Sequence, residues 1–514
     1  MEEPDIPKKR PYKPRTPART RASTTRIPDT WSGLDLSNQG IRNLSKHLFS
    51  LSFLTELYLN NNELESIPVS ITGLTNLEII DLSCNRLKTV IPEIGRMIYL
   101  RELNLGENYI SCLPMGIGTL YQLENLNLND NPLIEPFATI YKNKGGLGLI
   151  TFCKENNTGY EEPSERNWVD TDIYTDKKKK MRKGISYTLG ETISVATYNI
   201  LCSHYATNQA FGYVPSWVLQ WNNRREAIVQ EIVLLSSDIL CLQEVETSSY
   251  IEYFREELEI QCGYDSLFYP KTRAKSMSSS DRMQVDGCAT FWNKKRFTLV
   301  EQKCLEFSRT VLLDKRFNTN EDVINRNLNR DNIALVVVLE RVGLPGQIII
   351  VNAHIHWDPE YKDVKLFQTI LILEELKKLR DKYPFAGIVL VGDFNTLPSS
   401  PVYDLVCSGR ILPFNNDFGT FNYHPFSTGG FSHELGFSDA YADQDVGLTN
   451  FTPHFKGVID YIFYDDRLVL RSVLSTLDRE YCERVVGLPS IHCPSDHILL
   501  ASKFTLKGKL NKKT

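Results

Sequence analysis

The sequence predicts an α/β protein in which a leucine-rich-repeat solenoid is followed by a two-sheet α/β sandwich. Three observations carry this prediction. Leucines and asparagines recur with a period of 23 residues in the first third of the chain. From about residue 190, apolar β-branched runs alternate with segments of helical periodicity. Polar residues follow several of those runs, at the points where strands should end, which predicts a functional site on one rim of the sandwich.

The composition is that of a globular protein with a sizeable core. Of the 514 residues, 42% are hydrophobic and 24% are charged, and the net charge is -5. No apolar run reaches the roughly 20 residues that cross a bilayer, so we expect no membrane span. The basic start of the chain has no apolar core behind it, which argues against a secretory signal. The 11 cysteines include no C-x-x-C pair, which argues against zinc and disulfide frameworks and favours a reducing compartment.

The two ends of the chain are predicted to be basic tails. Residues 1–28 contain eight Lys or Arg residues and six prolines but few apolar residues, which is typical of a disordered segment. A solvated tail is one interpretation, and a role in nuclear import or RNA contact is the other. Residues 508–514 form a second, short basic tail.

Residues 29–155 carry the repeat L-x-x-L-x-L-x-x-N-x-L, which is the leucine-rich-repeat pattern. Each unit should place a short strand on a concave face, with stacked leucines in the core and the asparagine binding backbone groups at the turn. The first unit has Gln39 at the asparagine position, as a capping repeat often does. The in-phase residues are Leu34, Leu57, Ile80, Leu103 and Leu126, with Asn62, Asn85, Asn108 and Asn131. Such a solenoid is predicted to dock another protein.

Residues 156–187 are polar and are predicted to be the linker between the two domains. They include a run of basic residues at 177–183. The run is either a solvated charge cluster or a basic lip that feeds a nucleic-acid strand to the next domain.

Residues 188–507 are predicted to form one domain of two packed sheets with helices outside, because strands outnumber helices. We expect strands at residues 193–201, 238–245, 288–292, 333–340, 347–356, 387–393, 458–464 and 497–504. We expect helices at residues 222–235, 250–258 and 364–379.

Five short stretches hold the candidate catalytic and metal-binding residues. They are Gln243-Glu244-Val245, Asn352-Ala353-His354, Gly392-Asp393-Phe394-Asn395, Asp460-Tyr461 and Ser495-Asp496-His497. Carboxylates that converge with histidines and asparagines on one rim form a site for a hard cation together with proton-transfer groups. The sequence therefore predicts metal-assisted hydrolysis of a phosphate ester.

Two of these stretches predict the metal and the base. Glu244 ends a buried strand, where a lone carboxylate is costly, so it is predicted to bind a metal, with a buried salt bridge as the alternative. Asp393 and Asn395 flank one residue and should point to the same face of a strand, where they can hold and deprotonate a water. A structural Asx-turn is the alternative. One-metal and two-metal schemes both remain open.

The remaining candidates surround the phosphate. Asp460 and His497 are predicted to form a carboxylate–imidazole pair that favours the protonated imidazole and stabilises developing charge. Asp496 can hold a second cation. Asn199 is predicted to orient Glu244 or contact the metal's water, and His354 to donate to a phosphate oxygen. A satisfied core or turn residue is the alternative for these last two.

In this order, the stretches resemble the exonuclease–endonuclease–phosphatase superfamily. Longer motifs resemble one family within this superfamily, the catalytic deadenylase subunits of the CCR–NOT complex, which carry leucine-rich repeats. This resemblance covers about residues 30–507. These motifs are Y-N-I-L-C at 198–202, Y-V-P-S-W at 213–217, L-Q-E-V-E at 242–246, D-G-C-A at 286–289, H-W-D-P-E at 356–360 and the segment 455–464. The chain departs from this family in two respects. A short basic tail stands in place of the long Gln/Asn-rich N-terminal extension of some fungal relatives, and residues 308–329 and 417–438 differ from the family pattern.

The resemblance implies a Mg²⁺-dependent 3′→5′ exoribonuclease that shortens poly(A) and releases adenosine 5′-monophosphate. By position, it implies the following roles: Glu244 as Mg²⁺ ligand, Asp393 as base, Asn395 as water-positioning residue, Asp460 with His497 as the phosphate-side pair, Asn199 and Asp496 as metal support, and His354 as phosphate contact. Pro359 and Phe455 match the positions that sandwich adenine, with plain core packing as the alternative for Phe455.

The resemblance also implies partners and a location. The repeats would dock a DEDD-type deadenylase subunit and, through it, the CCR–NOT scaffold, in the cytoplasm with the nucleus as a second compartment. Two other functions stay open. One is a phosphatase of the same superfamily that acts on a small phosphorylated substrate, and the other is an inactive scaffold.

Overall fold

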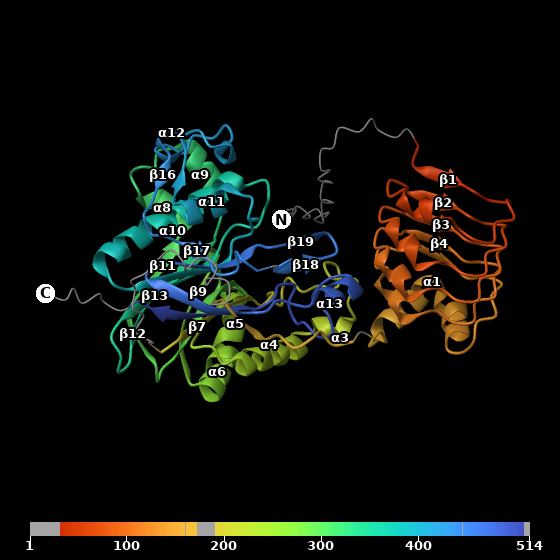
Figure 1. Cartoon of the computed structure of the whole chain (residues 1–514), viewed down its shortest axis with the longest axis horizontal. Helices are drawn as coiled ribbons and strands as arrows, with labels where there is room; N and C mark the ends of the chain where they lie inside the picture. Colours follow the sequence, from red (N-terminus) through yellow and green to blue (C-terminus); the bar gives the residue numbers. More distant parts are fainter. Residues whose placement is uncertain (1–30, 160, 172–190, 445, 508–514) are drawn as a thin grey trace, which may run out of the picture.

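The computed structural model describes residues 31–159, 161–171, 191–444 and 446–507. It contains a repeat unit (residues 31–159) and a sandwich unit (the described residues from 161 to 507), which lie side by side (Figure 1). The predicted tails at 1–28 and 508–514 and the basic run at 177–183 lie outside the described residues. Among the described residues, none of the helices combines the length and apolar composition needed to cross a bilayer.

The repeat unit is a solenoid whose strands pair in parallel, one repeat apart. Leu34 pairs with Leu57, Leu57 with Ile80, Ile80 with Leu103 and Leu103 with Leu126, so the predicted phase is the observed register. The strands are β1 (Gly33–Asp35), β2 (Glu56–Tyr58), β3 (Ile79–Asp81), β4 (Glu102–Asn104) and β5 (Asn125–Asn127). Short 3₁₀ helices return the chain: η1 (Lys46–Ser50), η2 (Val69–Gly73), η3 (Pro92–Arg96) and η4 (Met115–Thr119).

The repeat asparagines bind the backbone of their own repeat and of its neighbours, as their spacing predicts. Asn85 Oδ1 accepts from Leu64 N at 3.0 Å, and its Nδ2 donates to Leu59 O at 3.0 Å and Leu82 O at 3.1 Å. One buried amide thus satisfies backbone groups of two successive repeats. Without it, those groups would be buried without partners, which costs free energy.

We therefore expect Asn85→Ala to lower the free energy of unfolding of the repeat unit by about 2–4 kcal/mol, since several buried groups lose their partner. Thermal denaturation followed by circular dichroism measures the change. Asn125→Ala is the matched control, because Asn125 is exposed on β5. Equal melting temperatures for the two variants would contradict this account of the asparagine ladder.

A helix that the sequence analysis did not predict closes the repeat core. It is α1 (Phe137–Glu155), and its buried residues Leu149, Ile150 and Cys153 belong to the same core as the stacked leucines. The helix covers the last repeat, so the end of the repeat core is not exposed to water. Its last turn lies beside the sandwich unit, as Lys154 Nζ donates to Gly212 O at 3.3 Å.

The sandwich unit contains two large sheets, as predicted. The seven-stranded sheet has the order β6 (Trp168–Asp170), β21 (Leu468–Leu474), β22 (Leu500–Leu506), β7 (Ile193–Asn199), β8 (Ile239–Glu246), β10 (Asp286–Asn293) and β9 (Tyr264–Pro270). The six-stranded sheet has the order β11 (Phe297–Glu306), β12 (Ile333–Arg341), β13 (Gln347–His354), β14 (Gly387–Asp393), β20 (Asp460–Tyr464) and β17 (Ser438–Asp439). Two further two-stranded sheets are formed by β15 (Arg410–Ile411) with β16 (Phe431–Ser432) and by the hairpin of β18 (Asn450–Thr452) with β19 (Phe455–Gly457).

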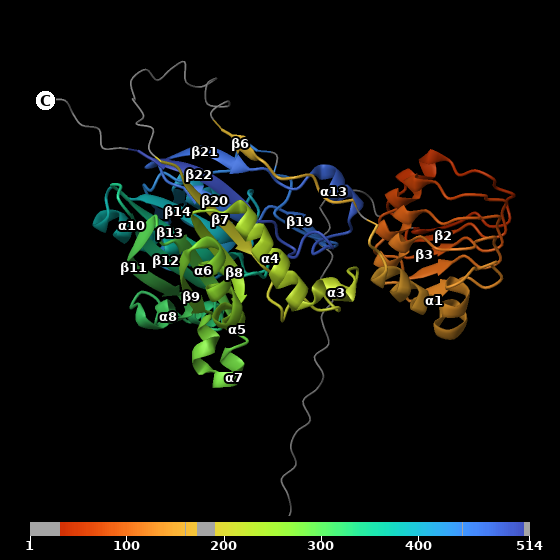
Figure 2. The ribbon, with the colours of Figure 1, turned by 90° about the horizontal axis from the view of Figure 1, so that it is seen from below.

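Helices cover the outer faces of both sheets (Figure 2). The long helix α10 (Lys362–Lys382) packs on the six-stranded sheet, and α4 (Trp221–Leu235) and α6 (Arg255–Cys262) pack on the seven-stranded one. A separate core lies between the sheets, where Val195 and Ile239 meet Ile350 and Val391. The shorter helices are α3 (Ser216–Leu219), α5 (Thr247–Ser249), η6 (Tyr250–Phe254), η7 (Thr272–Ser276), α7 (Ser279–Arg282), α8 (Phe307–Leu313), α9 (Glu321–Asn327), α11 (Pro401–Ser408), η8 (Asn416–Phe418), α12 (Phe426–Gly429) and α13 (Arg479–Arg484).

Part of the expected linker belongs to the sandwich unit. Residues 168–170 form β6, which pairs antiparallel with β21 through Val169 and Val473. Just before it, Arg166 donates to the backbone oxygens of Ser475 and Leu499. The polar composition of residues 156–187 concealed this edge strand, because an edge strand three residues long carries little hydrophobic pattern.

Candidate active site

Topology brings the predicted residues to one rim of the sandwich. Asn199 ends β7, Glu244 lies near the end of β8, and His354 and Asp393 end β13 and β14. Because β7 runs parallel to β8 and β13 parallel to β14, each pair ends at the same edge of its sheet. β20 runs antiparallel to β14, so its first residue, Asp460, lies opposite Asp393.

Glu244 is turned into the rim by a bulge in β8. Its φ is 60°, in the left-handed region that a non-glycine residue rarely adopts. The pairing of β8 with β10 shifts at the same place, between Gly287 and Ala289. Such a bulge re-aims a side chain and is often found beside active sites. The strained backbone conformation at Glu244 is the one that places its carboxylate at the rim.

A network of amide hydrogen bonds connects Glu244 with Asp393. Asn199 Nδ2 donates to Glu244 Oε1 at 3.2 Å and to Asp393 Oδ2 at 3.1 Å, and the other oxygen of Glu244 accepts from Cys202 N at 2.9 Å. The predicted orientation of Glu244 by Asn199 is thus present. Asn199 is buried, and its own Oδ1 accepts from Leu201 N.

Asn395 does not continue the strand of Asp393, contrary to the expectation that both point from one strand face. β14 ends at Asp393, and Asn395 has a φ of 47°. Its backbone N–H donates to Asp393 Oδ1 at 2.8 Å, and its side-chain amide donates to Ile355 O at 3.1 Å. The Asx-turn alternative is therefore present, and both side chains still line the same cavity.

Gly392 allows two strands to approach closely beside this turn. Its φ is 133°, and a Cβ at this position would lie 1.9 Å from Ala353 O. Only glycine fits there, so the Gly-Asp-Phe-Asn stretch is shaped by backbone sterics as well as chemistry.

Asp460 and His497 form the predicted pair. His497 Nδ1 lies 2.8 Å from Asp460 Oδ2, and its Nε2 lies 3.7 Å from Asp393 Oδ2. His497 precedes β22 and forms an isolated bridge with Asn450, so the expectation that a strand begins at 497 is wrong. Oxygen or nitrogen atoms of Asp393, Asp460 and His497 lie within 4.8 Å of one another, close enough to hold a metal ion.

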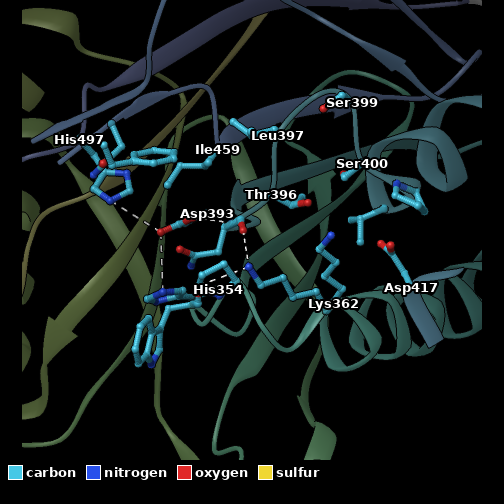
Figure 3. A pocket seen from close by; sticks show the side chains of 18 of the residues that line it. His354, Lys362, Asp393, Thr396, Leu397, Ser399, Ser400, Asp417, Ile459 and His497 are labelled. Carbon is cyan, nitrogen blue, oxygen red and sulfur yellow. Dashed lines mark hydrogen bonds and ion pairs between the residues drawn. The ribbon is translucent and has the colours of Figure 1, made fainter. Parts of the chain in front are cut away.

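The pKa values of the two histidines that flank Asp393 are shifted in opposite directions. His354 Nε2 is 3.7 Å from Asp393 Oδ2, the same distance as His497 Nε2, and Figure 3 shows Asp393 between the two rings. Burial lowers the pKa of His354 well below its usual range, and the charge of Lys271 adds to this. Burial also opposes the cation of His497, but the carboxylates of Asp460, Asp496 and Asp393 outweigh it and hold its pKa well above the usual range. His354 is thus neutral and His497 cationic at neutral pH.

Burial, with the negative charge of Asp460 added to it, raises the pKa of Asp393 to about 7, although His497 opposes the shift. A carboxylate with this proton affinity is suited to accept a proton from water near neutral pH. Burial likewise raises the pKa of Glu244, an effect that Lys271 opposes.

Glu244, Asp393 and the two histidines line an open cavity of about 730 Å³. Figure 3 shows His497, Asp393 and His354 on one side of it and Thr396, Leu397, Ser399 and Ser400 on the other. The volume exceeds what one phosphate group requires, so the cavity can accept a substrate with a sizeable organic part. The predicted residues that line it are Glu244, His354, Pro359, Asp393, Asn395, Phe455, Asp496 and His497.

The donor set fits a hard divalent cation. Glu244 and Asp496 both face the cavity, and oxygen atoms are the ligands that such cations prefer. Within the described part of the chain, Asp496 Oδ1 is buried and has no hydrogen-bond partner, whereas its Oδ2 accepts from Asn450 Nδ2 at 3.2 Å. A buried carboxylate oxygen without a partner is costly, and a bound cation would satisfy it.

Several residues of this cavity were not predicted from the sequence. Trp357 lies on its rim with 68% of its surface exposed, and Lys365, Asn450 and Asp417 also line it. Lys365 Nζ donates to Asn395 O at 2.7 Å and to Trp357 O at 3.3 Å, which ties together two rim segments. Trp357 belongs to a motif noted in the sequence, but Lys365 lies on α10 and Asn450 on a short hairpin, where no local pattern marks them.

Asn352, which shares a stretch with His354, lies inside the sandwich and not at the rim. Its Oδ1 accepts from Gln243 Nε2 at 2.8 Å, and its Nδ2 donates to Leu242 O and Ala289 O. It therefore ties the two sheets together, with Gln243 one position before Glu244 on β8 and Asn352 two positions before His354 on β13.

Comparisons with known proteins agree with this geometry. Residues 196–497 match the Endonuclease/Exonuclease/phosphatase family, and residues 32–87 and 75–133 match the leucine rich repeat. A protein of Encephalitozoon cuniculi named "Probable CCR4-Not complex 3'-5'-exoribonuclease subunit Ccr4" is 49% identical over 94% of this chain and 93% of its own length. The Saccharomyces cerevisiae protein named "CCR4-Not complex 3'-5'-exoribonuclease subunit Ccr4" is 41% identical over 92% of this chain and 58% of its own length.

Solved structures point to the same fold. ANGEL2, described as a 2',3'-cyclic phosphatase and solved in complex with adenosine-2',3'-vanadate, is 25% identical, with a TM-score of 0.52 over 67% of this chain and 99% of the ANGEL2 chain. The family match extends from the strand of Asn199 to His497, and the relatives also share the repeats. The chain therefore belongs to the endonuclease/exonuclease/phosphatase family and, within it, to the family of CCR4-Not complex 3'-5'-exoribonuclease subunits named Ccr4.

Proposed function

We propose that this protein is a 3′→5′ exoribonuclease that shortens the poly(A) tails of mRNA and releases 5′-AMP, with one or two Mg²⁺ ions as cofactor. The observation that carries the proposal is the position of Asp393. Its carboxylate lies between a neutral and a cationic histidine, in a cavity that also presents metal-binding carboxylates and an exposed aromatic ring. The names of the relatives supply the substrate class and the direction of cleavage.

The side chains divide the work of hydrolysis among them. Asp393 accepts the proton of the attacking water, and the Asn395 turn fixes the orientation of its carboxylate. Cationic His497, held by Asp460, stabilises negative charge on the phosphate oxygens or the leaving oxygen, and neutral His354 donates one hydrogen bond to the phosphate. The divalent cation, when held by Glu244 and Asp496, supplies Lewis-acid polarisation of the phosphate.

Phe455 and Pro359 provide an apolar slot for the 3′-terminal base. Both line the cavity, and Phe455 is 37% exposed, so its ring is not simply part of the core. The ring lies over Gly457, since a Cβ on Gly457 would be 2.8 Å from Phe455 Cζ. An aromatic face of this kind stacks on a base whatever its identity, so selectivity for adenine needs further polar contacts.

We expect Phe455→Ala to raise the KM for an A-tailed RNA about fivefold to 150-fold, from the roughly 1–3 kcal/mol that base stacking contributes. Steady-state rates on a 5′-labelled oligonucleotide give the KM. Phe414→Ala is the matched control, because Phe414 is 78% exposed and does not line the cavity. An unchanged KM for Phe455→Ala would mean that Phe455 only packs against its neighbours and does not stack on the base.

The names of the relatives place them in the CCR4-Not complex, and we propose the same assembly for this chain. In that assembly the repeats dock a DEDD-type deadenylase subunit, which binds the scaffold. Tyr58, Asp81 and Asn104 occupy the same position in three successive repeat strands and are partly exposed, so they belong to the face proposed for docking. Residence in the cytoplasm, with the nucleus as a second compartment, stays a prediction.

A small-molecule phosphatase is the second candidate, favoured by the similarity to the 2',3'-cyclic phosphatase ANGEL2. Parallel rate measurements on oligo(A), an adenosine 2′,3′-cyclic phosphate end and a small phosphomonoester separate the candidates. A higher kcat/KM on either of the last two would overturn the exoribonuclease proposal. An inactive scaffold is disfavoured, because every candidate position carries a chemically competent side chain.

A further inference from the structure

The repeat unit contacts the substrate side of the sandwich unit at one hairpin. This hairpin consists of β18, the turn residues Pro453 and His454, and β19, which begins with Phe455. Figure 1 shows β18 and β19, and Figure 2 shows β19, on the side of the sandwich unit that faces the repeats. The residue before the base-stacking ring thus lies at the boundary between the two units.

His454 is held by two tyrosines of the repeat unit. The Tyr121 hydroxyl is hydrogen-bonded to His454 Nε2 at 2.8 Å. The ring centroids of Tyr99 and Tyr121 lie 6.0 Å and 6.3 Å from that of His454. Both tyrosines occupy the turns that lead from a 3₁₀ helix to the next strand, at the edge of the solenoid. The contact therefore leaves the exposed strand face of the repeats free.

A second route connects Tyr121 with the same hairpin. Its ring lies 5.8 Å from that of Tyr213, and the Tyr213 hydroxyl donates to Leu488 O. Leu488 N in turn donates to Phe451 O at 2.7 Å, within β18. Beside this route, the α1 residue Glu155 accepts from the backbone N–H and hydroxyl of Ser216. The orientation of the repeat unit is thus defined by several contacts around the hairpin.

The other end of the hairpin is attached to the catalytic residues. Phe451 N donates to Asp496 O at 3.0 Å, and Asn450 bonds the Asp496 carboxylate and pairs with His497. The base of the hairpin is therefore fixed by the sandwich unit itself. Within its turn, Phe455 N donates to Thr452 Oγ1 at 3.2 Å, and His454, the residue before Phe455, contacts the repeat unit.

We propose that the repeat unit positions the base-stacking ring: Tyr121 and Tyr99 hold His454, and His454 fixes the start of β19 so that Phe455 faces the terminal base. Tyr121, Tyr99 and His454 are positioning residues that act through Phe455. The repeat unit is then part of the substrate-binding machinery as well as a docking surface. This inference rests on the proposed role of Phe455 in the exoribonuclease reaction.

The test measures KM and kcat of the full chain on a 5′-labelled RNA that ends in adenosines. Tyr121→Phe and His454→Ala should each raise KM about threefold to tenfold, since each removes one hydrogen bond. The kcat should stay within about twofold, because the base of the hairpin keeps its own bonds to Asp496. Tyr109→Phe is the matched control, since Tyr109 is 61% exposed on the repeat unit.

Combined variants show whether the contact between Tyr121 and His454 affects KM through the ring of Phe455. Tyr121→Phe combined with His454→Ala should be no worse than His454→Ala alone, because the hydrogen bond that Tyr121→Phe removes is already lost in His454→Ala. In a Phe455→Ala background, Tyr121→Phe should have no further effect on KM. The binding of fluorescent oligo(A) to the same variants made in an Asp393→Asn background should change in parallel, which gives a readout independent of turnover.

The outcomes separate this inference from the proposed function. If Phe455→Ala raises KM but Tyr121→Phe and His454→Ala do not, the positioning role is wrong and the base-stacking role stands. If Tyr121→Phe has its full effect in the Phe455→Ala background, the contact acts by another route and the inference is overturned. If Phe455→Ala leaves KM unchanged, the base-stacking role and this inference fail together.

Discussion

Asp393→Asn should reduce kcat on A-tailed RNA by at least about 10³-fold, because general-base catalysis contributes up to about 10⁴-fold and the amide cannot accept the proton of water. The change keeps the shape of the side chain, and the amide oxygen can still accept one of the two hydrogen bonds that the carboxylate accepts from Asn395 N and Asn199 Nδ2. Single-turnover rates with saturating enzyme measure the loss without interference from substrate affinity. Binding of oligo(A) should remain within a few-fold of that of the unchanged protein.

Asp417→Asn is the control for this prediction. Asp417 lines the same cavity but belongs to η8, away from the two histidines that flank Asp393. We expect its kcat to change by less than about tenfold, as it makes no contact with the reacting groups in this arrangement. Comparable losses for the two variants would mean that the charge of the cavity, and not a positioned base, governs the rate.

Glu244→Gln should weaken metal binding and reduce activity by more than about 100-fold at a fixed Mg²⁺ concentration, since even changes to groups that merely support a ligand cost about 10–100-fold. Two measurements separate affinity from chemistry. The Mg²⁺ concentration for half-maximal rate should rise. The increase in melting temperature that Mg²⁺ gives the unchanged protein should shrink, because a ligand stabilises the folded state only through binding to it.

Glu360→Gln is the matched control for Glu244→Gln. Glu360 follows Pro359 on the rim and is exposed, so its carboxylate is solvated and free of the buried network. Its Mg²⁺ dependence should equal that of the unchanged protein. If Glu244→Gln shows an unaltered Mg²⁺ dependence as well, the metal is held elsewhere, and the cluster of Asp393, Asp460 and His497 becomes the next candidate.

The repeat unit could be predicted from the sequence almost residue by residue, because its order is local. A period of 23 places Leu57 beside Leu34 and Ile80, and the asparagine after each strand has the same backbone partners in successive repeats. The helix α1 escaped prediction because it lacks the repeat and contains Gly145 with a φ of 67°, which interrupts the helical period.

The rim of the sandwich unit was predictable because polar residues at strand ends are visible in a linear sequence. Asn199, Glu244, His354 and Asp393 each stand at or near the end of an apolar run, and parallel pairing carries them to one edge. The left-handed conformation of Glu244 was not predictable, because it follows from strand pairing and leaves no mark on residue type, whereas that of Asn395 belongs to the Asx-turn that the sequence offered as an alternative.

Contacts between distant segments were beyond the sequence analysis. Tyr121 and His454 are 333 positions apart, and neither belongs to a motif with a chemical signature. The bridge from Gln243 to Asn352 spans 109 positions and inverts an expectation, since a polar residue next to a site residue turned out to point into the inter-sheet core. Asn352 stands two positions before His354 on β13, so both side chains point to the same face, and Asn352 lies one step deeper between the sheets.

The central claim is metal-dependent removal of adenosines from the 3′ end, and one measurement tests it directly. The purified chain is incubated with a 5′-labelled RNA that ends in about twenty adenosines, a length chosen to exceed the site of ~4–16 nucleotides that a single-strand-binding fold covers. With Mg²⁺ we expect a ladder that shortens from the 3′ end and stalls at the first residues that are not adenosine, and with EDTA no cleavage. Equal cleavage in EDTA, or internal cuts without a ladder, would contradict the account.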